Sequence, residues 1–266
     1  MISISKLTKE LKEKYRETKK SSIIAYIILR ILVILCMIRQ ILIGDINNAF
    51  LCALTLILFT IPTFVQKKFK LELPSMLETI IYVFIFSAEI LGEIYNFYGN
   101  ISNWDTILHT INGFLCAGIG LSLVDLLNEN SNKINLAPFY VVLVGFCFSM
   151  TVGVCWEFVE YSADKLLLLD MQKDQIVTTI STVSLNPNSE NKPVVIKNID
   201  KTILYDKDEN VIGEINNGYL DIGINDTMKD LFVNLIGAVT FSFIGYFYLK
   251  NKNKYKFAKN FIPKKE

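Results

Sequence analysis

Ionisable residues inside apolar stretches are the first candidates for chemistry, because a charged side chain in a membrane helix is costly and usually faces a polar interior. Asp105 and His109 are four residues apart, so a helix would place them one turn apart on one face. Glu157, Glu160 and Asp164 follow at helical spacing in a later apolar stretch. Each set predicts a polar stripe on an otherwise apolar helix.

A third stripe combines acids with an amide. Asp226, Asp230 and Asn234 recur every four residues, again on one helix face. If the helices alternate in direction across a membrane, these stripes all fall at the same end of the bundle. Together with the orientation argued below, the sequence therefore predicts an acidic site at the outer-leaflet end of the bundle.

The residue types in these stripes limit the chemistry. Neighbouring carboxylates raise one another's pKa, so a dense acidic site needs protons, a cation or basic partners. Hard divalent cations prefer carboxylate, amide and water oxygens, and some accept one imidazole. His109 could be a ligand, or a general base oriented by Asp105. The alternative is that these are ordinary helix-end residues solvated at the membrane surface.

Roles follow from that chemistry as hypotheses. We expect a divalent metal cation to be the cofactor if one is used. The residues assigned as catalytic are His109, Asp105, Glu157 and Asp230; those assigned to metal binding are Asp226, Asp230 and Glu157; those assigned to substrate binding are Arg39, Glu160 and Asn234.

Two of the three arginines fall in the first apolar stretch. Arg30, near its middle, cannot reach the surface easily and is expected to have a partner inside the bundle. Arg39, near its outer end, could pair with the acidic site, hold a lipid phosphate or extend to the interface.

Membrane-spanning helices must position these residues. The chain of 266 residues is 52% hydrophobic and has a mean hydropathy of +0.37, too apolar for an ordinary soluble domain. A span needs about 20 apolar residues. Six stretches qualify, at 22–43, 48–66, 77–98, 105–127, 138–163 and 227–249. The predicted fold is an all-α polytopic six-helix bundle.

Lysine placement predicts the orientation in the cell membrane. Lysines gather before the first span, at Lys67–Lys70 and after the last span, whereas loops 44–48 and 98–104 carry no Lys or Arg. Because basic residues stay inside, both termini are expected in the cytoplasm. This segregation also argues against nucleic-acid binding.

A polar segment lies between the last two spans. Short alternating runs in residues 170–219 are separated by turn-forming residues such as Asn186–Asn191, a pattern typical of strands and turns. We expect a small extracytoplasmic β insert that rests on the helix ends. The expected divisions are a basic N-terminus 1–21, helices 22–169, the insert 170–219, the last helix 220–250 and a basic tail 251–266.

Small residues predict where helices approach closely. Gly145, Ser149 and Gly153 recur every four residues, as do Gly113 and Ala117. This spacing favours ordinary close packing between membrane helices.

Three motifs in order resemble a known family. They are Trp104-Asp105-x-x-x-His109, Trp156-Glu157-Phe158-x-Glu160-Tyr161 and Gly218-Tyr219-x-Asp221-x-x-x-x-Asp226-x-x-x-Asp230-x-x-x-Asn234-x-x-Gly237-Ala238. Over residues 104–239 the chain resembles the uncharacterised YjdF-type bacterial inner-membrane proteins and, more distantly, the VanZ-like proteins associated with glycopeptide tolerance. The resemblance implies a membrane location and supports the choice of site residues; it implies no reaction.

Three functional hypotheses stay open. The first is action on membrane lipids or lipid-linked head groups in the cell envelope, by metal-assisted hydrolysis or transfer if the protein is an enzyme. The second is a proton- or ion-coupled transporter or flippase. The third is a non-catalytic interaction protein that works through the insert.

Overall fold

The computed structural model describes the backbone of residues 4–130 and 136–265 and the side chains of residues 21–68, 70–128, 136–255 and 257–263. Six helical stretches among the described residues are long and apolar enough to cross a membrane: Ser21–Ile43, Ile46–Lys68, Ser75–Ile94, Trp104–Asn128, Pro138–Leu167 and Ile224–Lys250. The predicted all-α polytopic bundle with a small β insert is confirmed.

The chain divides into two compact units. The helical unit comprises Met1–Gly153 and Phe232–Glu266, and the insert unit comprises Val154–Leu231. Two helices, α7 (Pro138–Leu167) and α8 (Ile224–Lys250), pass from one unit into the other. Each unit is described below by itself.

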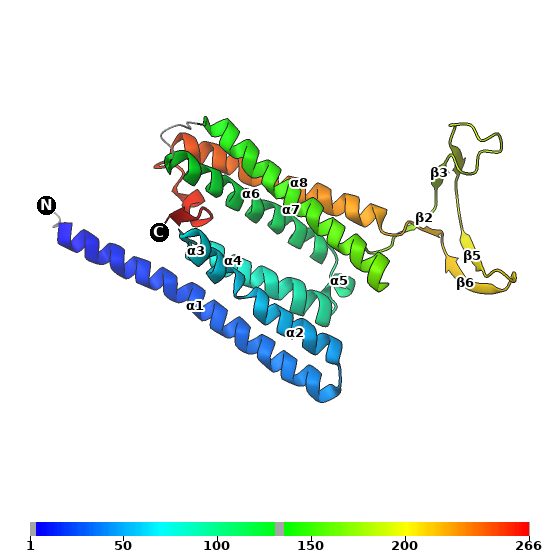
Figure 1. Ribbon diagram of the computed structural model, residues 1–266, viewed down its shortest axis with the longest axis horizontal. Coiled ribbons are helices and arrows are strands. Elements are labelled where there is room, and N and C mark those ends of the chain that lie inside the picture. The colour runs from blue at the N-terminus through cyan, green and yellow to red at the C-terminus, as the bar shows by residue number, and fades with distance from the viewer. Residues whose placement is uncertain (1–3, 131–135, 266) are drawn as a thin grey trace. The chain divides into compact units, whose positions relative to one another are not determined.

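The first two spans of the helical unit form a hairpin. The helix α1 (Ile4–Ile43) begins well before the first span, and α2 (Ile46–Leu58) follows it after a two-residue turn. Asp45 caps α2 by accepting a hydrogen bond from the Asn48 amide at 3.0 Å. In Figure 1, α1 and α2 lie side by side in blue.

The second span is two helices rather than the one that the sequence predicts. After α2, the chain begins again as α3 (Ile61–Phe69), with Pro62 in its first turn. Proline lacks an amide hydrogen and is tolerated there, because the first amides of a helix have no intrahelical acceptor.

The third span changes its helical type. It begins as α4 (Ser75–Phe86), continues as a wider π-helix η1 (Ser87–Ile94) that carries Glu89 and Glu93, and is followed by the short α5 (Phe97–Asn100). The Ser87 carbonyl accepts a hydrogen bond from the Trp104 indole at 3.3 Å. This contact ties the wider turn to the start of α6 (Trp104–Asn130).

Glycines let α6 and α8 approach to backbone contact. A Cβ added at Gly113 would lie 2.1 Å from the Asn234 carbonyl oxygen, and one at Gly237 would lie 2.0 Å from the Thr110 carbonyl oxygen. Ser149 of α7 donates to the Gly113 carbonyl at 2.8 Å. The close packing that the small residues predict is confirmed for Gly113, Ser149 and Gly153.

The C-terminal residues turn back into the helical unit. After α8, a 3-10 helix η2 (Lys256–Asn260) leads to β8 (Lys264–Lys265), which pairs with β1 (Leu71–Glu72). Phe261 is buried, with its ring centroid 5.3 Å from that of Phe114. The basic residues of this segment predict only a solvated tail, whereas Phe261 and Ile262 are buried.

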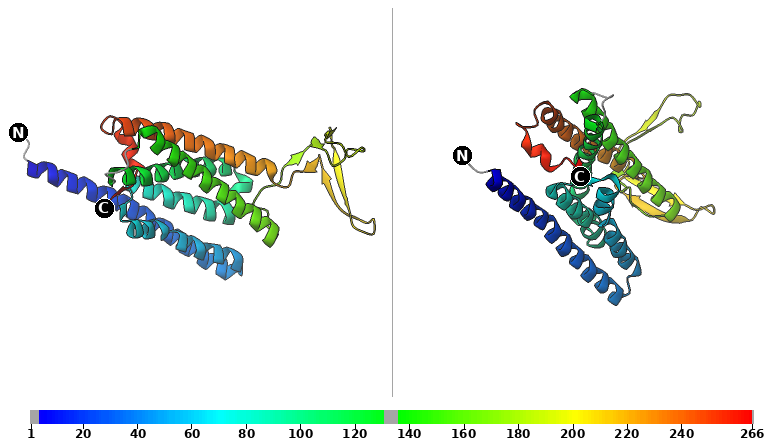
Figure 2. Two further views of the ribbon diagram at one scale, coloured as in Figure 1. Left: turned by 45° about the horizontal axis from the view of Figure 1, so that its top comes forward. Right: turned by 60° about the vertical axis from the view of Figure 1, so that its left-hand side comes forward.

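The insert forms three two-stranded antiparallel ribbons. The base pairs β2 (Ile176–Val177) with β7 (Tyr219–Leu220); beyond it, β3 (Ile180–Thr182) pairs with β4 (Val194–Ile196), and β5 (Lys201–Tyr205) with β6 (Val211–Asn216). The β3–β4 and β5–β6 ribbons separate into two arms (Figures 1 and 2). Most of their side chains are exposed, so they bury little core.

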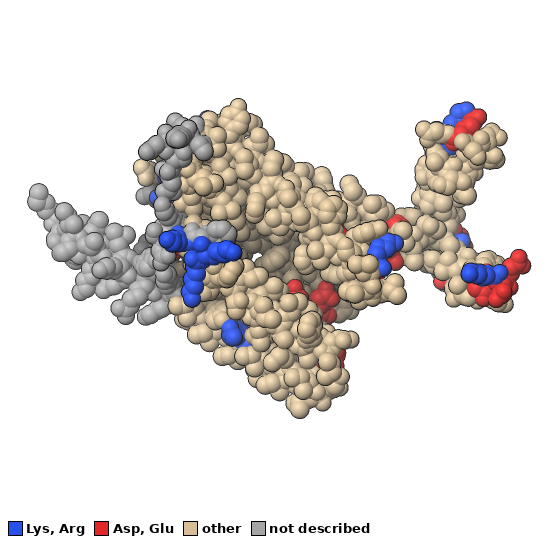
Figure 3. Space-filling model, viewed as in Figure 1, with Lys and Arg blue, Asp and Glu red and all other residues tan. Residues whose placement is uncertain are grey.

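Charge is distributed unevenly on the visible face. Figure 3 shows acidic and basic side chains together on the arms of the insert and a surface of mostly uncharged side chains over the helices. Ion pairs such as Lys201–Glu214 at 2.6 Å belong to these exposed arms. An uncharged surface is what a bilayer requires of the helices that cross it.

Candidate functional site

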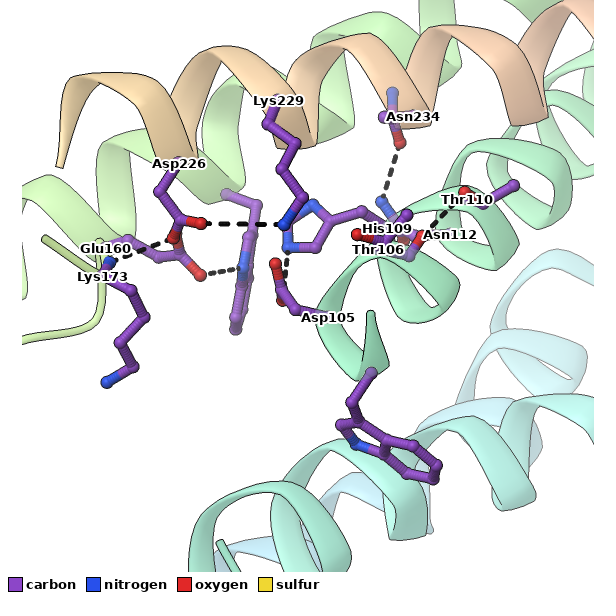
Figure 4. Close-up of polar contacts among 12 residues, drawn as sticks. Asp105, Thr106, His109, Thr110, Asn112, Glu160, Lys173, Asp226, Lys229 and Asn234 are labelled. Atoms are coloured by element: carbon purple, nitrogen blue, oxygen red, sulfur yellow. Dashed lines mark hydrogen bonds and ion pairs between the residues drawn. The ribbon is translucent and has the colours of Figure 1, made fainter. Parts of the chain in front are cut away.

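One polar pair lies at the start of α6 in the helical unit. His109 is buried, and its Nε2 lies 3.4 Å from Oδ1 of Asp105, one helical turn earlier. The carboxylate can therefore orient the ring, as the sequence analysis predicts for this pair. The two side chains are labelled in Figure 4.

A second polar pair in the helical unit joins α6 to α8. The Asn112 amide donates to the Asn234 side-chain oxygen at 3.2 Å (Figure 4), and Asn234 in turn donates to the Met150 sulfur at 3.6 Å. Asn234 is fully buried. Asn112 is not among the predicted site residues, because it is not ionisable; its position as an amide at mid-span is the signal that identifies it.

A glycine makes room for that amide. A Cβ added at Gly153 of α7 would lie 2.7 Å from Nδ2 of Asn234. Asn234, predicted as a substrate ligand, is thus enclosed by Asn112, Met150 and Gly153 within the helical unit. These contacts indicate a role in holding the helices together.

The insert unit holds a set of buried acidic side chains. Four carboxylates on α7 and α8 are exposed by only 1–8%: Glu157, Glu160, Asp226 and Asp230. Figure 4 shows the carboxyl groups of Glu160 and Asp226 pointing toward one another. The Trp156 indole donates to Glu160 at 2.7 Å and fixes one of its oxygens.

Backbone and lysine groups complete the surroundings of Asp226. Its Oδ2 accepts a hydrogen bond from the Lys173 amide at 3.0 Å, and its Oδ1 lies 4.0 Å from the Lys229 ammonium (Figure 4). Asp164 accepts from the Met171 and Gln172 amides at 2.6 and 2.9 Å. These bonds fasten the base of the insert to the ends of α7 and α8. The expectation that the insert rests on the helix ends holds for this base and not for the arms, which extend away.

Asp221 serves the turn that leads into α8. Burial acts to raise the pKa of its carboxyl group, but hydrogen bonds from the Gln175, Asn225 and Gly223 amides outweigh burial and hold that pKa below its usual value. A carboxylate so fully used by backbone amides is a structural group.

The two arginines of α1 have different surroundings. Arg30 donates to the Tyr26 hydroxyl one turn away, and its guanidinium carbon lies 5.5 Å from the centre of the Tyr26 ring. The expected partner inside the bundle is therefore a tyrosine on the same helix. Arg39 is exposed and makes no ion pair within the described part of the chain, so its predicted role in substrate binding stays a prediction.

Together, these observations define a multi-pass membrane protein with buried polar groups on its last three spans. The chain belongs to a family described as "Predicted membrane protein (DUF2238)", whose model matches residues 23–251. The proposed relationship to YjdF-type and VanZ-like proteins stays a prediction.

One curated relative is an uncharacterised protein of Thermotoga maritima. It is 29% identical to this chain over 106 residues, which are 40% of this chain and 53% of the relative. The match thus spans about half the length of that relative. No solved structure matches the chain.

Proposed function

We propose that this membrane protein binds a divalent cation through the carboxylates of α7 and α8 and acts on the head group of a membrane lipid or lipid-linked substrate. The observation that carries the proposal is the burial of Glu157, Glu160, Asp226 and Asp230 on two membrane-spanning helices of one unit. Carboxylate oxygens are the ligands that hard divalent cations prefer.

The orientation of the Glu160 and Asp226 carboxyl groups, which are directed toward one another in Figure 4, favours a cation. Two ionised carboxylates that face one another repel, and a shared positive charge relieves this repulsion. Lys229 supplies one positive charge at 4.0 Å from Asp226. A divalent cation would neutralise two further negative charges of the four carboxylates, and several oxygens bind such a cation at once.

Position along the helices favours a head group as the substrate. At about 1.5 Å rise per residue, Asp226 lies about 3 Å from the start of α8, Asp230 about 9 Å from it, and Glu160 about 10 Å from the end of α7. These depths correspond to the boundary between head groups and acyl chains, since the hydrocarbon core is about 30 Å of a bilayer about 40–45 Å thick.

The class of reaction follows from the residues. A bound divalent cation supplies Lewis acidity toward a phosphoryl or carbonyl oxygen. Within the insert unit, Glu157 is the carboxylate that we expect to accept a proton from water. Hydrolysis or group transfer is the chemistry that these groups permit.

The test is the metal content of the purified protein and the effect of EDTA on its melting temperature. We expect stoichiometric metal in the wild type, a lower melting temperature after EDTA treatment, and loss of both signals in Asp230→Asn. A ligand at 100 times its Kd stabilises a protein by about 2.7 kcal/mol, which is easily measured.

Asp208→Asn is the matched control, because it removes the same charge from an exposed turn of the insert. It should keep the metal and the response to EDTA. A wild-type protein without metal and without a response to EDTA would overturn the cation proposal.

Ion-coupled transport is the second candidate, and the depth of polar groups along α8 favours it. Asn234 lies about 15 Å into α8, near the middle of the span, so polar groups continue below the carboxylates on that helix. Proton flux into liposomes that Asp230→Asn abolishes, without any bound metal, would support transport in place of head-group chemistry.

A further inference from the structure

A groove runs along the helical unit between α7 and α8. Its volume is about 320 Å³. Its apolar lining includes Val142, Leu143 and Phe146 of α7 and Val239 and Phe243 of α8. Leu143 and Phe243 remain exposed by 42% and 65%, so the groove opens sideways along the two membrane-spanning helices.

The length of the groove fits one acyl chain. It extends from Phe139 to Phe146 on α7 and from Val239 to Tyr246 on α8. Seven residues of helix rise about 10 Å, which is most of one leaflet's half of a hydrocarbon core about 30 Å thick. A groove lined mainly by apolar side chains favours hydrocarbon over water inside a bilayer, and the Ser242 hydroxyl is one polar group in its wall.

One end of the groove carries a fixed positive charge. Tyr246 lies at that end, and the Lys250 ammonium lies 4.6 Å from the centre of its ring, one turn later on α8. Tyrosines are frequent at the level of lipid head groups. Lys250 is exposed, so its ammonium can contact a phosphate while the ring keeps the side chain over the groove.

We propose that this groove is a binding site for an anionic phospholipid, with one acyl chain along α7 and α8 and the phosphate at Lys250. Charge complementarity identifies the occupant, since a lysine at the end of an apolar groove selects a lipid with a negative head group. The proposal uses residues other than the buried carboxylates and does not depend on them.

The probe is spin-labelled phosphatidylglycerol compared with spin-labelled phosphatidylcholine, each added to the full-length protein in phosphatidylcholine vesicles. We expect the wild type to immobilise the anionic lipid several-fold more strongly than the zwitterionic one. Lys250→Gln should remove most of this preference, whereas Lys68→Gln should leave it unchanged. Lys68 is the matched control because it is also exposed and 5.5 Å from an aromatic ring, that of Phe64.

Filling the groove tests the acyl chain separately. Leu143→Trp should reduce the immobilised fraction of both lipids, because the larger ring occupies the groove. Leu32→Trp on α1 is the control, since Leu32 is exposed by 44%, close to the 42% of Leu143. Equal binding of both lipids to the wild type, or equal losses in the variants and their controls, would overturn the proposal.

Discussion

The helices of the helical unit pack in two different ways. In the group formed by α1, α2 and α4, the clustered buried side chains are mostly apolar, including Val33, Cys52 and Phe59. Buried polar groups such as Gln40 and Thr55 bond within their own helix. In the group formed by α6, α7 and α8, glycines bring backbones into contact and an amide pair crosses between helices.

The difference matters because lipid removes most of the hydrophobic driving force between membrane helices. An apolar contact between α1 and α2 replaces a similar contact with lipid, so its geometry can vary at little cost. The contact between Gly113 and the Asn234 backbone leaves no such freedom. The polar spans α6–α8 are therefore held in one arrangement, which a binding site built on those helices requires.

The largest expected effect comes from adding one carbon at the close approach. In Gly237→Ala the new Cβ would meet the Thr110 carbonyl oxygen at 2.0 Å, and neither backbone can move away easily. We expect a loss of about 3 kcal/mol, measured as a lower melting temperature in detergent. Gly213→Ala is the control, because its Cβ would lie 3.3 Å from the flexible end of Leu204. Equal stability of the two variants would contradict the close-approach argument.

A smaller effect is expected from the amide pair. Asn234→Ala removes the acceptor of the Asn112 amide and should cost about 1–2 kcal/mol in the same melting experiment. Thr55→Val on α2 removes a hydroxyl that is also fully buried but bonds only to the Leu51 carbonyl of its own helix. If Thr55→Val cost as much as Asn234→Ala, hydrogen bonds between helices would not distinguish the two groups.

Cys52→Ala should cost still less, about 1 kcal/mol, because neighbouring apolar side chains on α1 and α4 can close over the lost thiol. The melting temperature again reports the effect. A loss as large as that of Gly237→Ala would show that the first group is packed as rigidly as the second.

The smallest effect on the stability of the whole protein is expected at the base of the insert. Unlike the neutral amide pair, this region has a stability that depends on pH. The folded-state pKa of Asp221 is held below its usual value, so its contribution to stability is present above the unfolded pKa, about 3.9, and is lost as pH falls through the folded pKa. Asp221→Asn should raise the rate of proteolysis in the insert about threefold at neutral pH and leave the melting of the helices unchanged. The wild type should become equally sensitive at low pH; cleavage of the wild type that is independent of pH would contradict this role.

Hydropathy predicts the six spans well, because about twenty consecutive apolar residues fit a membrane-spanning helix and few other structures. The break before Pro62 and the π-helix at Ser87–Ile94 were not predicted, since both depend on which backbone carbonyls find donors. The strand segments of the insert were anticipated from alternation, and their pairing came from the structure.

The candidate site was predicted unevenly. Glu157, Glu160, Asp226 and Asp230 are buried as the cost of membrane charges implies, and Asp105 does lie beside His109. Arg39 is exposed, which agrees with extension to the interface and leaves its role in substrate binding a prediction. Asn112 gives a weaker sequence signal, since an uncharged amide costs less in a span than a carboxylate.

The burial of Phe261 also orders the assembly of the protein. Its ring packs against Phe114 and Phe241, yet it follows α8 in the chain, so these contacts form only after the last span has been inserted and the chain has turned back. The α6–α8 core is therefore completed only after this last aromatic residue has been synthesised. A chain truncated after Lys250 should insert all its spans but lack the Phe261 contacts with Phe114 and Phe241, and we expect it to be proteolysed faster than the full chain.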